Sequence, residues 1–459
     1  MPPLPPIRIL SPTAILGYGF PEDSFAAGLR MNPDVIAVDA GSTDPGPYYL
    51  GAGISFTTKP AVRRDLRLIL AAGRERGIPV LVGSAGGAGA RPHLDWCVDI
   101  IRDIAAEDGH DGTLAVIPTD LDVARVQSAF DGGRIHPMPA GVPPTTEAIG
   151  ASTHIVAQIG ETPLIQALTN GADVVVAGRC YDPAVFAALP ILRGYPVGLS
   201  LHMGKILECA AIAAVPGSGS DCMFATLDET GFTVETLSDM RVCTVTSVAA
   251  HTLYEKSDPY HLPGPGGRLD LTATEFEQID ERRVRVTGTT FTPSPAHMVK
   301  LEGARLTGYR TVSIAGARSP DFVARLDDIL DGVRATVTNQ FPQLASRQAT
   351  LLFRAYGRDA VMGPLEPERH IVPHEVGLVI ESVADTQEIA DAICAFARST
   401  LLHFGYEGRK STAGNLAFPY SPSDFKAGEV YEFSIYHLMQ IDDPEAAFPA
   451  IMMPLRDTP

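Results

Sequence analysis

Short runs of apolar residues, each followed at once by a polar or glycine-rich loop, recur through the first half of the chain. Such continuous runs without alternation are typical of strands buried on both faces of a parallel sheet. Segments with helical spacing, such as Arg63–Arg76 and His93–Ala105, stand between them. The predicted strands are Ile7–Leu10, Val35–Ala40, Ile78–Val82, Leu114–Ile117, His154–Ile159 and Asp173–Ala177. The first half is therefore predicted to be a mostly parallel α/β sheet with flanking helices.

After about residue 200 the apolar positions begin to alternate with polar ones, as expected for antiparallel strands with one exposed face. The strands predicted here are Arg283–Val286, Tyr309–Ile314 and Glu375–Glu381. A chain of 459 residues exceeds what one core usually serves, so two domains are expected. We expect an α/β domain over 1–225 with a polar cleft at the strand ends. A smaller α+β domain over 226–459 is expected to pack against that cleft and partly cover it.

Proline and glycine crowd the segment Pro259–Gly267, PYHLPGPGG, which predicts an ordered turn or a mobile lid in place of a regular element. Helical spacing of apolar residues marks the other predicted helices. These are Ser24–Arg30, Asp120–Phe130, Thr162–Asn170, Leu201 to about Val215, and Gln387–Phe404.

Composition and charge narrow the classes of function. With 45% hydrophobic and 20% charged residues the chain can bury a large core. A formal net charge of −18 argues against nucleic acid or an anionic membrane as partner, although a local basic pocket for a small anion is compatible with it. The six cysteines are scattered, which predicts a reduced chain without disulfides and without a metal site. No leader-like or membrane-spanning apolar stretch is present, so a soluble cytoplasmic protein is expected.

The first candidate site follows the strand that ends near residue 40. Asp39 is succeeded by Gly41, Ser42, Thr43 and Asp44. Ligands of open α/β sheets bind outside the carboxyl ends of the strands, and a glycine there lets backbone N–H groups face an anion. We interpret Asp39 and Asp44 as catalytic, and Gly41, Ser42 and Thr43 as substrate-binding. The alternative is that Asp39 and Ser42 only cap the turn.

A glycine-rich loop, GSAGGAGA, follows the next strand. Ser84, Gly86 and Gly87 could present N–H groups to a phosphate or carboxylate at a helix start. The spacing matches neither a dinucleotide fingerprint nor a Walker A loop. A tight strand-to-helix crossover is the equal alternative.

The loop GRCYDP after the last parallel strand carries three candidate catalytic residues. Arg179 could clamp a carboxylate with two hydrogen bonds, and Cys180 could act as a thiolate. Asp182 could be a base, although its place before Pro183 also suits an N-cap.

Two later segments add candidates. His202, Lys205 and Cys209 share one helix face, where the lysine would depress the histidine pKa and tune a general base. His251 and Tyr254 lie three residues apart and could form a proton-transfer pair. Burial of these histidines in a core is the alternative.

The polar loop STAGNLAFPYSPSD contains Asn415 as a candidate ligand contact. Turn formation is the ordinary role of such a loop.

The segments DAGSTDPGPYYLG, GSAGGAG, GRCYDPA, AAHTLYEKSDPY and STAGNLAFPYSPSD together resemble the acyclic terpene utilisation AtuA family, over about Ile7 to Tyr436. The resemblance implies a place in the catabolism of branched acyclic terpenes such as citronellol and geraniol, or of related acids. Larger members carry an additional C-terminal ferredoxin-like domain, whereas others have it as a separate protein. The resemblance therefore implies a small ferredoxin-fold subunit supplied in trans, or one that is dispensable here.

These observations favour an enzyme of the lyase or hydratase type acting on a small branched carboxylic acid or its CoA thioester. CoA would enter as part of the substrate, and the sequence requires no other cofactor. One alternative is acyl or phosphoryl transfer with Cys180 as nucleophile, and another is a non-catalytic scaffold or binding subunit. A homo-oligomer is the default expectation. In the leading hypothesis the anion is held by Ser42, Gly86, Gly87 and Arg179, and a proton is moved by Asp39, Asp44, His202 or His251.

Overall fold

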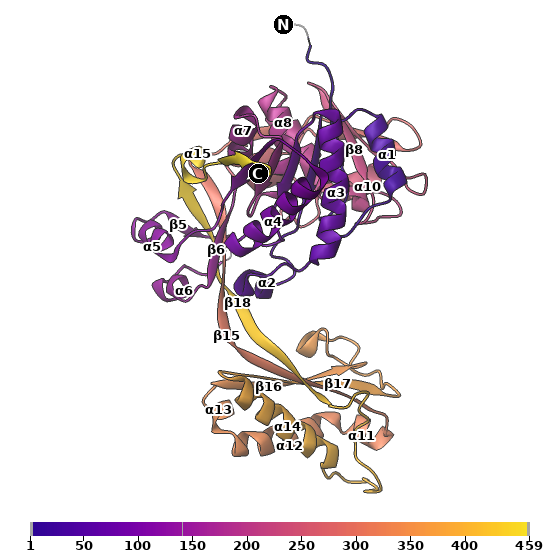
Figure 1. Ribbon diagram of the computed structural model, residues 1–459. Coiled ribbons are helices and arrows are strands. Elements are labelled where there is room, and N and C mark those ends of the chain that lie inside the picture. Colours follow the sequence, from indigo (N-terminus) through magenta and orange to yellow (C-terminus); the bar gives the residue numbers. More distant parts are fainter. Residues whose placement is uncertain (1–2, 140, 457–459) are drawn as a thin grey trace. The chain divides into compact units, whose positions relative to one another are not determined.

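The computed structural model describes residues 3–139 and 141–456, which form two compact units (Figure 1). The first unit consists of two segments: the described residues up to Arg305 and those from Phe433 onward. The second unit is Leu306–Glu432. This boundary differs from the division expected after residue 225, because strands beyond that residue extend the sheet of the first unit.

The first unit is built on a large sheet of order β12-β13-β9-β8-β1-β2-β3-β7-β4-β19. Its middle strands β1, β2, β3, β7 and β4 are parallel, which confirms the predicted α/β sheet. These strands are Ile7–Ser11, Val35–Asp39, Val80–Gly83, Val174–Ala177 and Thr113–Ile117. Nearly all of their residues are buried, as expected for continuous apolar runs covered on both faces.

Antiparallel strands extend this sheet at both sides. On one side they are β8 (Met223–Leu227), β9 (Gly231–Thr236), β13 (Arg283–Thr287) and β12 (Glu275–Gln278). On the other side β19 (Ile451–Pro454) pairs with β4. The chain therefore returns to its first unit at the end to complete the sheet.

The fifth predicted parallel strand does not join the large sheet. β6 (His154–Gln158) pairs antiparallel with β15 (His297–Ala317), because the outer edge of β4 is taken by β19. A single parallel bridge between Ile159 and Cys180 still brings the end of β6 beside the end of β7. The loops after these two strands thus remain neighbours.

Helices cover both faces of the large sheet, because alternate strand residues point to opposite sides. Val80 and Val82 pack with α3 and α4, whereas Leu81 faces the core of α7, α8 and α9. The helix predicted from Leu201 starts earlier and is followed by a 3₁₀ turn at Ala210–Ala213. The helices of this unit are α1 (Glu22–Arg30), α2 (Pro47–Ala52), α3 (Lys59–Arg76), α4 (Arg91–Asp108), α5 (Val123–Asp131), α6 (Thr146–Gly150), α7 (Thr162–Thr169), α8 (Asp182–Leu192), α9 (Val197–Leu207), α10 (Val245–Thr252) and α15 (Pro444–Ala447).

The proline- and glycine-rich segment is a β-hairpin, so the prediction that it lacks regular structure is wrong. β10 (His261–Gly264) and β11 (Gly267–Asp270) pair antiparallel, and β14 (Thr290–Pro293) completes a small sheet. Pro265 and Gly266 form the turn, with φ +72° at Gly266. Proline followed by a glycine of positive φ is the chemistry of a tight turn.

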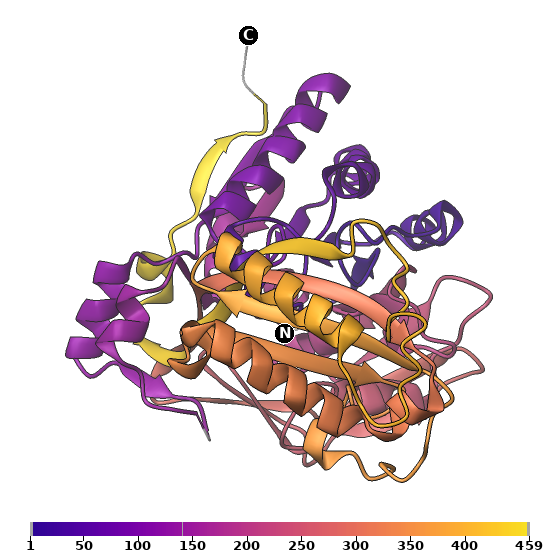
Figure 2. The same ribbon diagram turned by 90° about the horizontal axis from the view of Figure 1, so that it is seen from below.

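The second unit has a β-α-β-β-α-β order. β15 leads into α11 (Pro320–Ala324), α12 (Leu326–Gln340) and α13 (Pro342–Ala345), and the chain continues through β16 (Ala349–Tyr356), β17 (Val376–Ala384), α14 (Gln387–His403) and β18 (Asp424–Ile441). The sheet order is β16-β17-β15-β18, the arrangement of a ferredoxin-like split βαβ fold. Figure 2 shows α12 and α14 side by side on one face of the sheet. The upstream part of β15 and the downstream part of β18 belong to the first unit, where β18 also pairs with β5 (Ile135–Pro137).

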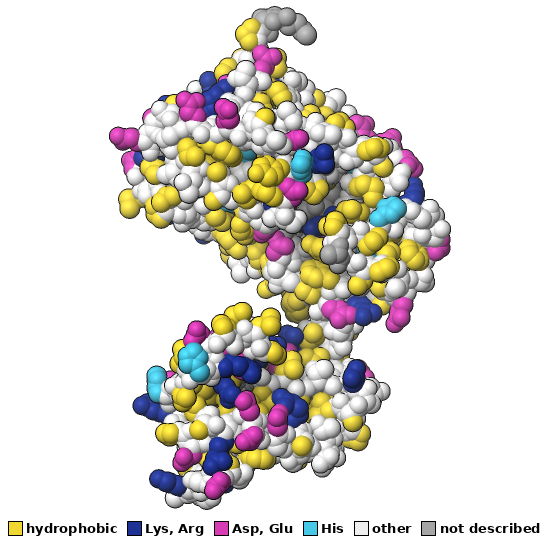
Figure 3. Space-filling view, turned by 180° about the vertical axis from the view of Figure 1, so that it is seen from behind, with side chains coloured by type: hydrophobic (Ala, Val, Ile, Leu, Met, Phe, Trp, Pro, Cys, Tyr) yellow, Lys and Arg dark blue, Asp and Glu magenta, His cyan; other side chains and the backbone are white. Residues whose placement is uncertain are grey.

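The surface carries charges of both signs. Figure 3 shows acidic and basic side chains interspersed over the face in view. None of the helices in the described part of the chain combines the length and apolar composition needed to cross a bilayer.

Candidate functional site

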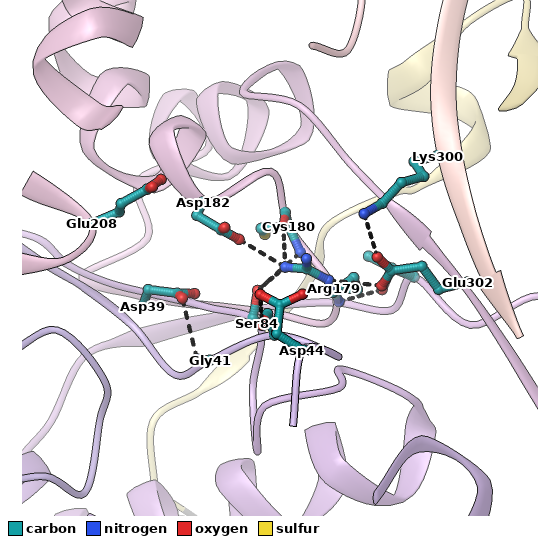
Figure 4. A network of polar contacts seen from close by, with 12 residues as sticks. Asp39, Gly41, Asp44, Ser84, Arg179, Cys180, Asp182, Glu208, Lys300 and Glu302 are labelled. Atoms are coloured by element: carbon teal, nitrogen blue, oxygen red, sulfur yellow. Dashed lines mark hydrogen bonds and ion pairs between the residues drawn. The ribbon is translucent and has the colours of Figure 1, made fainter. Parts of the chain in front are cut away.

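Polar side chains from three neighbouring strand ends gather at the carboxyl edge of the large sheet (Figure 4). Asp39 ends β2 and stands in register with Gly83, the last residue of β3. Ser84 follows β3, and Arg179 follows β7 in the next strand position. The parallel order predicted from the sequence therefore places these residues at one edge.

Arg179 is the centre of a buried polar network. Its side chain is 3% exposed, and its Nε donates to Glu302 Oε2 at 3.0 Å. Its Nη1 donates to Asp182 Oδ1 at 2.7 Å, to Ser84 Oγ at 3.0 Å and to the Cys180 carbonyl at 2.7 Å. The guanidinium thus binds carboxylates of the protein itself, whereas the sequence suggested a clamp on a substrate carboxylate.

Glu302 is the main counter-charge, and the sequence analysis missed it. Burial raises the Glu302 pKa, but Arg179 and Lys300 outweigh that effect and lower the pKa to about 2. Lys300 Nζ lies 2.6 Å from Glu302 Oε1. Burial likewise opposes the Arg179 charge, yet the attraction of Glu302, then Asp182 and Asp39, raises the Arg179 pKa. Lys300 and Glu302 lie two residues apart, on one face of the strand, in the short segment MVKLEGA, and this local spacing is the signal that could have revealed them.

Asp39 has a different environment from the other carboxylates. It is 6% exposed, and its Oδ2 accepts a hydrogen bond from the Gly41 N–H at 3.2 Å. Burial first, and then the nearby charge of Asp182, raise the Asp39 pKa well above its ordinary value, while Arg179 opposes them. Asp39 therefore keeps its proton to a higher pH than an ordinary aspartate.

The loop after Asp39 is held by its own side chains. Ser42 Oγ donates to Asp44 Oδ2 at 2.7 Å, and the Asp44 N–H donates to Ser42 Oγ at 3.1 Å, while Thr43 is buried. Gly41 has φ +124°, and a Cβ there would lie 2.6 Å from the Phe56 ring. The backbone conformation and the packing against Phe56 therefore require a glycine at this position, whether or not it also contacts a substrate.

Two adjoining cavities open beside these residues and share Asp44, Asp182, Glu208 and Glu255. The first, of about 340 Å³, is called here the polar arm. Its charged lining consists of the cations Arg179, Lys205, Lys256 and Lys300 and the anions Asp44, Asp182, Glu208, Glu255 and Asp258. The second, of about 290 Å³, is called the apolar arm and is lined by Asp39, Ser42, Cys209, Tyr254 and the apolar Ala14, Ile15, Tyr18, Pro45, Phe56 and Ile212.

The wall between the two arms carries a buried ion pair. Lys205 Nζ contacts Glu208 Oε1 and lies 5.4 Å from the centroid of the Tyr254 ring. Burial raises the Glu208 pKa to about 7, against the attraction of Lys205. The imidazole of His251 stacks on Tyr254, with the ring centroids 5.4 Å apart. Lys205, His251 and Tyr254 are therefore neighbours, and Glu208 is a member that the sequence analysis did not single out.

His202 lies apart from the cleft, in the core of the first unit. Its Nδ1 is 2.7 Å from Thr289 Oγ1, its Nε2 is 2.9 Å from Thr252 Oγ1, and Phe232 packs on its edge. Burial, and secondarily Lys205, lower the His202 pKa to about 3. The direction expected from Lys205 is right, but burial is the larger cause, and the ring lines neither arm.

The glycine-rich loop is buried along its whole length, 83–90. Gly86 and Gly87 have positive φ, and Cβ atoms there would lie within 2.8 Å of His93 and 2.5 Å of Phe56. A Cβ at Gly89 would lie 2.1 Å from the backbone nitrogen of Arg179. These glycines permit close packing of neighbouring loops, which favours the crossover interpretation over an open phosphate loop.

Asp182 does not cap its helix. Tyr181 is the N-cap residue of α8 and makes no side-chain cap bond, while the Asp182 carboxylate pairs with Arg179. The N-cap interpretation of Asp182 is therefore wrong. Asn415 belongs to the second unit, where its Nδ2 donates to the carbonyls of Leu401 and Phe404 at 2.9 Å, as a turn-forming residue does.

Cys180 is fully buried, and burial raises the pKa of its thiol to about 12. Burial and then the charge of Glu208 raise the pKa of the Cys209 thiol as well, so accessibility decides the order of labelling, and among the six cysteines Cys209 alone is partly exposed. We expect iodoacetamide, added to the metal-free folded chain, to label Cys209 first and to leave Cys180 unmodified until the protein unfolds. Peptide mass mapping over time measures this order. Early labelling of Cys180 would instead support its role as a nucleophile.

A parallel sheet with polar side chains at the carboxyl ends of its strands makes the first unit an α/β domain, a class in which ligands bind at that edge of the sheet. The model of the acyclic terpene utilisation family protein AtuA matches residues 58–417, and the chain belongs to this family. The family indicates a role in acyclic terpene utilisation. A search of curated proteins and a search of solved structures gave no match. The matched range includes the GRCYDP loop and starts after Asp39 and Asp44.

Proposed function

We propose that this chain is an enzyme of the lyase or hydratase type that acts on a branched carboxylic acid or its CoA thioester. The observation that carries this proposal is the forked cleft, in which Asp182 lines both arms and Asp39 lines the apolar one. Four cations stand among five carboxylates in one arm, and apolar side chains gather in the other. Such a cleft suits a molecule with an anionic head and a branched hydrocarbon tail.

The polar arm supplies the binding of the head group. Lys256 lies in this arm, with its Nζ 5.5 Å from the centroid of the Tyr181 ring. Burial, and then the charge of Lys205, lower the Lys256 pKa, so an incoming anion gains a cation that is already largely desolvated. Phe56, Ile15 and Ile212 of the apolar arm would contact the branched tail.

Asp182 and Asp39 would act as the proton-transfer pair, since Asp182 is ion-paired with Arg179 whereas Asp39 is buried without a salt bridge among the described residues. Asp182, held by Arg179, would accept the proton from the carbon next to the carbonyl, and the electrons of that C–H bond would form the new C=C bond. The C–O bond at the next carbon would break with its electron pair. Asp39 would protonate the departing hydroxide, which leaves as water. The reverse sequence is hydration.

The test is proton exchange in D₂O. We expect the chain alone to introduce deuterium next to the carbonyl of branched acyl-CoAs or free acids. NMR spectra recorded over time measure this exchange. Lys256→Gln should raise KM about 10-fold or more, because a hydrogen bond to a charged group contributes about 1.5–3 kcal/mol. Lys410→Gln, in a loop of the second unit, serves as the matched control.

The alternatives give different results. Absence of both exchange and ligand binding would contradict the proposal. Binding without exchange, with exchange restored by a small ferredoxin-fold subunit, would favour the hypothesis of a binding subunit.

A further inference from the structure

Three residues with metal-binding side chains meet at the wall of the apolar arm. Glu208 and Cys209 follow the end of α9, and His251 lies near the end of α10. One ligand atom from each side chain can be chosen so that all lie within 4.8 Å of one another. We propose that Glu208, Cys209 and His251 bind a divalent transition-metal ion of the zinc type.

Unpaired polar atoms supply an independent reason. Glu208 Oε2 and His251 Nε2 are buried and have no hydrogen-bond partner among the described residues, and both residues are 5% exposed. A buried polar atom without a partner costs stability, so two of them beside a thiol point to a ligand that is bound there. A metal ion bound through these two atoms would satisfy both at once.

The donor set determines the kind of ion. A thiolate, an imidazole nitrogen and a carboxylate oxygen suit Zn²⁺ or Co²⁺, whereas Mg²⁺ and Ca²⁺ prefer oxygen ligands throughout. Coordination requires that the Cys209 thiol release its proton to solvent. Glu208 and the thiolate then bring two negative charges to a cluster that holds the dication and the ammonium of Lys205. The ion-paired Lys205 remains on the other carboxylate oxygen, Oε1, and leaves Oε2 for the metal.

Three protein ligands leave a coordination position open, as in catalytic zinc sites. Glu208 and Cys209 both line the apolar arm, so this position is adjacent to the cleft. A carbonyl or carboxylate oxygen of a ligand in the cleft could complete the coordination. The sequence predicted no metal site, because His251 lies more than 40 residues after Glu208 and Cys209 and only the fold brings the three side chains together. This inference goes beyond the proposed function and does not depend on the lyase reaction.

The experiment titrates the chelator-treated full chain with Co²⁺ alone. We expect one ion per chain, visible bands of tetrahedral cobalt, a near-ultraviolet thiolate-to-metal band, and loss of these bands when Zn²⁺ is added. Cys209→Ser should abolish the thiolate band, and His251→Gln should weaken binding at least 10-fold. Cys394→Ser, at a buried cysteine of the second unit, is the matched control and should bind as the parent chain does.

A measurement on the unmodified chain guards against variants that fail to fold. Zn²⁺ should slow alkylation of Cys209 at least 10-fold relative to the chelator-treated chain. The proposal is overturned if Co²⁺ gives no thiolate band, if the band persists in folded Cys209→Ser, or if Zn²⁺ leaves the alkylation rate of Cys209 unchanged.

Discussion

Replacing Arg179 with alanine will lower the free energy of unfolding by about 3–5 kcal/mol, the range for breaking a buried ion pair, because the buried Glu302 loses one of its two cationic partners. Glu302 is fully buried and would retain Lys300 alone as its ion-pair partner, and Asp182 would lose its ion pair with Arg179. The fall in activity will therefore include a loss of folded protein. The sequence suggested a clamp on a substrate carboxylate, whereas the buried network predicts a structural role for the same side chain.

Urea denaturation of Arg179→Ala, Glu302→Gln and the double variant measures this coupling. The double variant should lose less stability than the sum of the single changes, since the two residues share one interaction. Arg283→Ala is the matched control, because Arg283 pairs with Asp280 on the surface and such pairs contribute about 0–1 kcal/mol. Additive losses, or a loss from Arg179→Ala no larger than the control, would contradict the assignment.

Asp39→Asn will lower turnover by about 10²–10⁴-fold, the usual contribution of a positioned proton donor, and will at the same time stabilise the fold at neutral pH. The folded-state pKa of Asp39 is raised above 3.8, so the folded chain holds a proton that the unfolded chain releases. The parent protein therefore loses stability as pH rises from about 3.8 through the folded-state pKa. Asparagine removes this loss and still accepts the Gly41 N–H bond.

The difference in unfolding free energy between Asp39→Asn and the parent, measured from pH 3 to pH 8, checks whether the substitution stabilises the fold as pH rises. It should be near zero below the ordinary aspartate pKa and should increase in favour of the variant above it. Asp65→Asn is the control: this buried carboxylate binds Gly17, Gly19 and Arg64 outside the cleft, so its loss should lower stability and leave turnover near that of the parent. A variant at Asp39 with parental turnover would exclude it as the proton donor.

The sequence was sufficient to predict the parallel strands, because a buried strand is a local pattern: residues 35–38 and Val174–Ala177 are apolar throughout. It also placed Asp39, Ser84 and Arg179 at one edge, since parallel strands share the direction of their carboxyl ends. The pairing of β6 could not be predicted, because it depends on β19 occupying the edge of β4 more than 300 residues later.

The site could be predicted only in part for the same reason. Glu302 becomes the partner of Arg179 through a contact spanning 123 residues, and no local spacing announces it. His202 shares its helix with Lys205, yet it faces Thr252 and Phe232 instead of the cleft. The direction of a side chain toward core or cleft is decided by tertiary packing, which a helical spacing cannot specify.

The return of the chain through β18 and β19 has a consequence for synthesis on the ribosome. The second unit is one continuous stretch, Leu306–Glu432, and can fold as soon as it emerges. The first unit, although translated earlier, keeps the outer edge of β4 unpaired until Ile451–Pro454 has left the exit tunnel. For that interval the nascent chain presents an open strand edge to other polypeptides, so the later-made unit matures first and the earlier-made one completes last.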